Sequence, residues 1–134
     1  NTIASLNSQI AGKDNTIYSL NSQTTTLTAI VNLGKSEIWV DHHEISDPAG
    51  YYTQWTFHAD YAGYVSVKII EANTTSTYVQ AIYSAYGVHY DNKIDVPAGG
   101  GAVFPILPST GIEVRIGDNQ PINANETVTI TFYY

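Results

Sequence analysis

The chain has 134 residues, enough for one globular domain with a hydrophobic core, and 43% of them are hydrophobic, which excludes a disordered chain. Five Lys and Arg against 12 Asp and Glu give a net charge of −7, which argues against nucleic-acid binding and docking on anionic lipid, since both need clustered cations. Cysteine is absent, so disulfides, thiolate metal sites and thiol nucleophiles are excluded.

The composition of the surface indicates an extracellular or cell-surface protein. Charged residues make up only 13% of the chain, and Ser, Thr, Asn, Gln and Tyr take their place. No apolar run is long enough to cross a membrane and no signal peptide is visible, so we expect no membrane contact within this segment. The chain starts at Asn1 without Met, and we expect it to be a processed or excised piece.

An eight-residue stretch near the start of the chain occurs twice, as TIASLNSQ at 2–9 and as TIYSLNSQ at 16–23. The offset is two heptads, and apolar residues spaced at 3.5 residues are typical of helices that wind around one another. Position a holds Ile3, Ile10, Ile17, Thr24 and Val31, and position d holds Leu6, Lys13, Leu20, Leu27 and Gly34. The predicted oligomerisation seam is Ile3, Leu6, Ile10, Ile17, Leu20, Leu27 and Val31.

Two other interpretations of this segment are open. A helix packed on its own β-domain needs a wider apolar stripe, whereas the e and g positions hold Asn7, Asp14, Asn21, Gln9, Thr16 and Gln23. Disorder is the second alternative, because Ser, Thr and Asn are mediocre helix formers. We predict a coiled-coil helix over residues 1–34 whose partners are copies of the chain, with Gly34 at the positive φ that ends it. Ile at a and Leu at d favour a dimer, and Lys13 and Thr24 weaken that rule.

After Gly34 the period changes to two, which predicts a β-domain over residues 35–134. Turn-forming segments such as DPAG and LPSTG separate eight alternating runs, without a helical pattern between them. This arrangement indicates an antiparallel β-sandwich or jelly roll. The predicted strands are Ser36–Ile45, Tyr51–Ala59, Tyr64–Ala72, Thr77–Ala85, Val88–Val96, Ala102–Ile106, Ile112–Ile116 and Thr127–Tyr134.

The predicted core takes the bulky apolar residues of these runs. It comprises Trp39 or Val40, Trp55, Phe57, Val65, Val67, Ile69, Val79, Ile82, Ile94, Phe104, Ile106, Val114, Val128, Ile130 and Phe132. The face that Tyr78, Tyr83, Tyr86 and Tyr90 occupy is open at this point.

The segment WVDHHEI, residues 39–45, collects side chains that can bind a metal. Neighbours in a strand point to opposite faces, so only Asp41 with His43, or His42 with Glu44, share a side. A zinc site needs further ligands, and nothing in the spacing brings them there. We interpret this segment as an exposed polar strand and expect no metal.

A loose resemblance to a calcium loop occurs in IGDNQPINANE, residues 116–126. Asp118, Asn119, Asn123 and Glu126 offer oxygen ligands close together, but the 12-residue EF-hand spacing is absent.

Catalytic motifs are not found. The sequence has no G-x-S-x-G elbow, and no carboxylate pair for glycoside hydrolysis can be selected. The glycine-rich run at 97–102 lacks the ending of a phosphate loop and is interpreted as a hairpin connection. We therefore expect a non-enzymatic protein without a cofactor.

Tyrosines and asparagines supply the remaining candidates. The eleven Tyr residues fit sugar or protein contacts, and they also fit cross-strand pairs that stabilise sheets. Two N-x-[ST] sequons, at Asn73 and Asn125, are candidate N-glycosylation sites, since both fall in predicted loops.

An Ile/Leu heptad helix of the SLNSQ type followed by a Tyr- and Thr-rich β-domain resembles prokaryotic surface proteins, archaeal ones first. The layout of one helix and one sandwich is similar to archaeal type IV pilins and related filament subunits. That resemblance implies helices bundled in a filament core and sandwiches that coat it. Pilin helices are nearly all apolar, whereas this one is polar on most faces, which fits a narrow coiled-coil stalk better. The β-domain also looks like jelly-roll heads on trimeric stalks, or carbohydrate-binding sandwiches.

The sequence thus predicts a non-enzymatic extracellular structural subunit that self-assembles through its N-terminal helix and displays a β-sandwich. It would belong to a surface filament, a pilus-like appendage or a stalk. The alternative is an oligomeric adhesin or carbohydrate-binding head that recognises glycan or a cell surface. A third is an enzyme whose site the sequence does not reveal.

Overall fold

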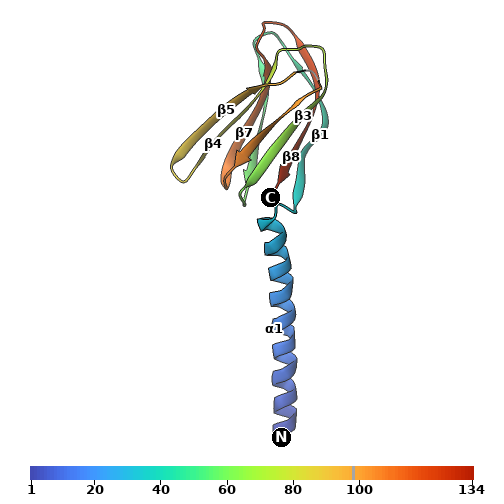
Figure 1. The fold of residues 1–134 in the computed structure, drawn as a ribbon, viewed down its shortest axis with the longest axis vertical. Coiled ribbons are helices and arrows are strands. Elements are labelled where there is room, and N and C mark those ends of the chain that lie inside the picture. Colours follow the sequence, from blue (N-terminus) through green and yellow to red (C-terminus); the bar gives the residue numbers. More distant parts are fainter. Residues whose placement is uncertain (98) are drawn as a thin grey trace. The chain divides into compact units, whose positions relative to one another are not determined.

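The computed structural model describes residues 1–97 and 99–134, which form two compact units, Asn1–Gly34 and Lys35–Tyr134 (Figure 1). In the first unit, helix α1 spans Thr2–Val31. The Asn1 side chain caps it by accepting hydrogen bonds from the N–H groups of Ile3 at 2.8 Å and Ala4 at 3.2 Å. Within the described part of the chain, no helix is long and apolar enough to cross a membrane.

The end of α1 differs from the prediction. Leu33, with φ 53°, takes the positive-φ position, and Gly34 follows it. The Gly34 N–H donates to the Ala29 carbonyl at 2.6 Å, and the Leu33 N–H donates to the Ile30 carbonyl at 3.0 Å. These two bonds form a Schellman motif, in which the left-handed residue is one position earlier than expected.

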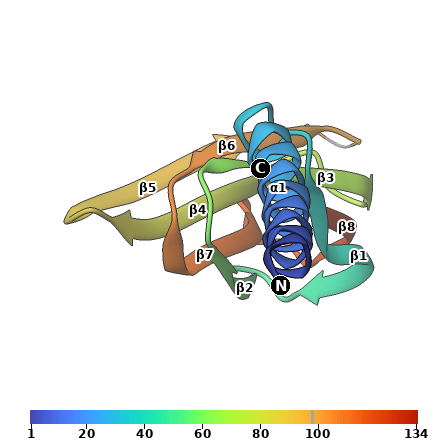
Figure 2. The same cartoon turned by 90° about the horizontal axis from the view of Figure 1, so that it is seen from below.

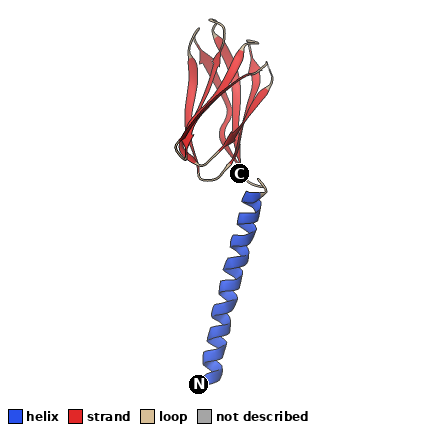
Figure 3. Cartoon of the chain, turned by 60° about the vertical axis from the view of Figure 1, so that its left-hand side comes forward, coloured by secondary structure: helices blue, strands red, loops and turns tan. Residues whose placement is uncertain are grey.

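The second unit consists of eight strands in two four-stranded sheets (Figure 3). The strands are β1 Ser36–Asp47, β2 Tyr52–Ala59, β3 Gly63–Ala72, β4 Thr77–Ala85, β5 Val88–Asp95, β6 Gly101–Ile106, β7 Ser109–Asp118 and β8 Ala124–Tyr133. All eight predicted strands are confirmed, and β7 is longer at both ends than Ile112–Ile116. β8 begins at Ala124 rather than Thr127, so Asn125 lies in a strand and not in the predicted loop. Of the glycine-rich run at 97–102, Ala98 lies outside the described residues.

The strand order identifies a jelly roll. One sheet has the order β1-β8-β3-β6 and the other β2-β7-β4-β5. The antiparallel pairs β1–β8, β2–β7, β3–β6 and β4–β5 are nested, like one long hairpin folded over on itself. This is the double-sheet arrangement expected of a jelly roll, so the predicted fold class is confirmed.

The core lies between the sheets and follows the period of two. Val65, Val67 and Ile69 of β3 face Val114 and other buried residues of the opposite sheet. The inner faces of two facing sheets bury such alternating side chains together.

An aromatic stack closes one side of this core. The Trp39 ring lies 4.4 Å from the Phe57 ring and 4.9 Å from the Phe132 ring, measured between centroids. The two Trp residues therefore pack against the core rather than face solvent.

Two predicted core residues, Ile82 and Ile94, lie elsewhere. On β4 the buried, inward residues alternate, and Val79, Ala81 and Tyr83 are among them, so Ile82 faces outward opposite Glu113. Ile94 lies on β5, the edge strand, and is 37% exposed. The β4–β5 hairpin extends away from the neighbouring strands (Figure 1 and Figure 2), so the inner side of β5 has little cover.

Candidate functional site

The predicted seam lies along α1 as seven exposed apolar side chains. Their exposed fractions run from 51% for Leu6 to 81% for Val31. Within the described chain, no residue of α1 is buried. Leaving this much apolar surface in water is unfavourable by about 25 cal/mol for each Å². The predicted seam is therefore an exposed apolar row along α1.

The metal-binding candidates in β1 do not converge. Register shifts at Val40 and His43 form an irregular, bulged edge strand, in which His42 has φ 44°. The His42 ring nitrogen contacts the neighbouring Asp41 carboxylate, while His43 lies edge-on to Trp55 at 5.8 Å. In residues 1–97 and 99–134, no group of three or more His, Cys, Asp or Glu is arranged to hold a metal ion.

The candidate calcium ligands make separate internal hydrogen bonds. Asp118 accepts from the hydroxyls of Thr74 and Ser76, each at 2.5 Å, and from the Gln120 N–H at 2.7 Å. Burial alone would raise the pKa of Asp118, but these three hydrogen bonds together lower it below its ordinary value of 3.8. They tie the β3–β4 loop to the end of β7.

The other oxygen ligands bind elsewhere. Asn119 Oδ1 accepts from Lys93 at 2.8 Å, and Asn123 Oδ1 accepts from the Ala49 N–H at 3.1 Å. These oxygens stabilise loops and do not surround a common point.

Glu126 is the unusual member of this set, because it points into the core at one end of the sandwich and is only 3% exposed. Its Oε1 accepts from the Thr77 hydroxyl, and none of the described residues donates to its Oε2. Burial raises the pKa of Glu126 above 4.5. The hydrogen bond from Thr77 lowers this pKa by a smaller amount, and the negative charges of Asp118 and Asp47 raise it further. The sequence analysis placed Glu126 in a loop and missed this role.

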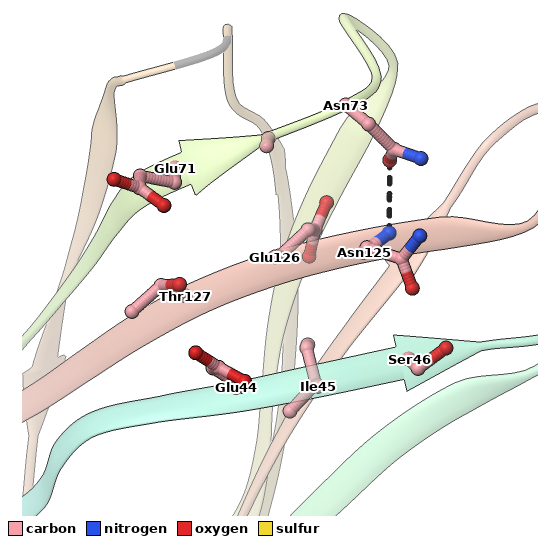
Figure 4. Close-up of a pocket in the computed structure, with 9 residues that line it drawn as sticks. Glu44, Ile45, Ser46, Glu71, Asn73, Asn125, Glu126 and Thr127 are labelled. Carbon is pink, nitrogen blue, oxygen red and sulfur yellow. Dashed lines mark hydrogen bonds between the residues drawn. The ribbon is translucent and has the colours of Figure 1, made fainter.

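The described surface includes an open pocket of about 600 Å³ on the outer side of β1, β8 and β3. Glu44 and Glu71 face each other across Thr127, their common cross-strand partner (Figure 4). None of its nine lining residues, all described, is aromatic or His. It therefore offers neither a stacking platform for a sugar nor a His-based nucleophile site.

The two sequon asparagines, which are 52 residues apart in the chain, meet at this pocket. The Asn125 N–H donates to Asn73 Oδ1 at 2.8 Å, shown as the dashed line in Figure 4. Asn73 Nδ2 also donates to the Asn123 carbonyl at 3.4 Å. Both asparagines are exposed, but the Asn73 side chain is engaged in joining the β3–β4 loop to β8.

Several tyrosines form the cross-strand pairs that the sequence analysis considered. The rings of Tyr64 and Tyr133 stack at 4.7 Å, as do those of Tyr83 and Tyr90. Each pair joins directly opposite residues of neighbouring strands. Such pairs stabilise a sheet.

Comparison with known proteins bears on the fold. No protein family matches the sequence, and no curated protein matches it either. The chain is similar to the Yersinia pseudotuberculosis-derived mitogen, at 8% identity over 72% of this chain and 85% of that one, with a TM-score of 0.53. This likeness shows the fold alone.

Two further solved structures are similar at lower scores. The C-terminal domain of A223, a structural protein from sulfolobus turreted icosahedral virus, has 13% identity, covers 75% of this chain and 96% of that one, and gives a TM-score of 0.39. The carbohydrate-binding module CBM36, in complex with calcium and xylotriose, has 11% identity, covers 73% of this chain and 98% of that one, and gives a TM-score of 0.40.

Proposed function

We propose that the chain is a non-enzymatic structural subunit, located outside the cell or on its surface, that self-associates through α1 and displays the jelly roll. Its assemblies would form a surface filament, a pilus-like appendage or a stalk. The observation that carries the proposal is the row of seven exposed apolar side chains at heptad spacing on α1.

Burial of the seam supplies the driving force. Each seam side chain exposes half or more of its surface, so covering it contributes about 1 to 2 kcal/mol before the entropy cost of association. The helix is rich in Ser, Thr and Asn, and such a helix is marginal by itself in water. Association would therefore stabilise the helix as well as join the chains.

The distribution of charge supports the same role for α1. Lys13 and Asp14 are its only charged residues, so the helix has no net charge, and the net charge of −7 belongs to residues 35–134. Helices can approach one another without electrostatic repulsion, whereas the jelly rolls repel one another over most of their surfaces. This difference favours assembly through the helix with the jelly rolls displayed outside.

A double substitution in the seam tests the proposal. Ile10→Asp with Leu20→Asp places two carboxylates at positions a and d, where association would bury them. The matched control, Tyr18→Asp with Ser22→Asp, adds the same charge at outward positions b and f. Light scattering measures the mass, and circular dichroism measures the helix content.

We expect the unmodified chain and the control to have a multiple of the 14.6 kDa chain mass. The seam variant should have the mass of one chain and less helix. If the seam variant keeps the mass of the unmodified oligomer, α1 does not join the chains and the proposal is wrong.

A further inference from the structure

The two sheets of the jelly roll present outer faces of different character. On the β2-β7-β4-β5 sheet, the outward side chains include charged groups that contact polar neighbours. Arg115 forms an ion pair with Glu113, and Gln80 donates to Asp91 at 2.6 Å. Paired charges of this kind are typical of a face that stays in water.

The outer face of the other sheet carries Glu44, Glu71 and Lys68 toward one end. Toward the other end lies a region without charged side chains, called here the β8 face. Ile38, Thr131, Ser66 and Val103 form one row across β1, β8, β3 and β6. Tyr64 and Tyr133, stacked at 4.7 Å, lie in the next row. Ile38 on β1 is 61% exposed and Val103 on β6 is 53% exposed, so an exposed apolar side chain lies on each edge strand of the sheet. None of these six side chains carries a charge.

These properties favour a second copy of the chain as the partner. Each jelly roll carries the whole net charge of −7, so two of them can meet closely only over surfaces that lack acidic side chains. A basic or acidic partner would find no complementary charge on the six side chains. Uncharged aromatic and branched apolar residues are the composition found at the centres of interfaces.

The size of the face also fits a contact between tethered copies. Two rows of residues, each about 6.8 Å along strands that lie about 4.8 Å apart, cover roughly 300 Å² across the four strands. Stable interfaces bury about 800 Å² on each partner. The β8 face is therefore much too small to hold two free jelly rolls together, and it can contribute only when a helix raises their effective concentration.

We propose that the β8 face is a second contact surface between copies of this chain, which forms once α1 has associated. This inference rests on the proposed self-association of the helix. It goes beyond it because the jelly roll then contributes to assembly, instead of being displayed passively at the end of a stalk or around a filament.

Charge introduced into the β8 face of the full chain tests this. Ser66→Glu places a carboxylate in the middle row. Its control, Gln54→Glu, places the same charge on the outer face of the other sheet, opposite Arg115. Dilution followed by light scattering gives the concentration at which each oligomer dissociates. We expect Ser66→Glu to raise that concentration at least tenfold, and Gln54→Glu to change it less than twofold.

A labelling experiment gives a second readout that does not depend on a charged variant folding. Because the chain has no cysteine, Ser66→Cys introduces a single thiol. Its reaction with a maleimide should be at least tenfold slower in the oligomer than in a chain that also carries Ile10→Asp and Leu20→Asp. Thr56→Cys, on the exposed side of β2, should react at one rate in both backgrounds.

The outcomes separate the two proposals. Suppose that the unmodified chain associates, that Ser66→Glu leaves the dissociation concentration unchanged, and that Ser66→Cys reacts equally fast in the oligomer and in the seam variant. The β8 face is then not an interface and the helix acts alone. If the unmodified chain is a monomer, both proposals are wrong. If the seam variant stays associated and only Ser66→Glu dissociates, the proposed role of α1 is wrong and the β8 face is the main interface.

Discussion

Replacing Glu126 by Gln should make the stability of the jelly roll less dependent on pH. Gln keeps an oxygen for the Thr77 hydroxyl and cannot ionise. The raised pKa of Glu126, caused chiefly by burial, means that the folded state holds this proton more tightly than the unfolded state, whose pKa is near 4.5. The stability that the proton supplies is complete below pH 4.5 and is lost as the pH rises through the folded pKa.

The size of the effect follows from linkage. Between pH 4.5 and the folded pKa, the free energy of unfolding of the unmodified chain should fall by about 1.4 kcal/mol per pH unit relative to Glu126→Gln. Above the folded pKa the difference stays constant. The total difference at pH 7 therefore measures the pKa shift that burial imposes.

Urea unfolding at several pH values between 3.5 and 7.5 measures this difference. Tryptophan fluorescence follows the jelly roll specifically, because Trp39 and Trp55 both belong to it. Glu37→Gln, at an exposed position, is the control for removing a carboxylate in general. A difference between the unmodified chain and Glu126→Gln that does not change with pH would refute the reasoning.

Two further predictions concern the same fold. Asp118→Asn should reduce the free energy of unfolding most above pH 3.8, and the reduction should vanish as the pH falls through the lowered pKa of Asp118. This trend is opposite to that of Glu126, and urea unfolding at several pH values tests it. Gly63→Ala should lower the free energy of unfolding by about 1 to 3 kcal/mol, because the new methyl would lie 1.9 Å from the Tyr133 carbonyl oxygen. Gly111→Ala, whose added methyl would have no atom within 4 Å, should change the free energy of unfolding by less than about 0.5 kcal/mol; urea unfolding of both variants tests this.

The strands were predictable because their alternation is local, but their order was not. The pairing of Ser36 with Tyr133 joins the first and last strands of the β-domain sequence, and nothing in either segment specifies the other. The same limit applies to the meeting of Asn73 and Asn125 at one pocket.

Errors inside elements have local causes. On β4 the sequence offers Ile82 as the bulky residue, but the alternation from buried Val79 places Ala81 and Tyr83 inward and Ile82 outward. Glu126 was assigned to a loop because it ends the turn-forming segment DNQPINANE, residues 118–126. Extending the alternation of Val128 and Ile130 backwards would have placed it in the core.

The mass of the unmodified chain in solution, measured by light scattering over a dilution series, tests the central claim most directly. Self-association through α1 predicts a multiple of 14.6 kDa that falls toward one chain on dilution, accompanied by a loss of helix signal. A mass of 14.6 kDa at every concentration, with the helix signal unchanged, would contradict it.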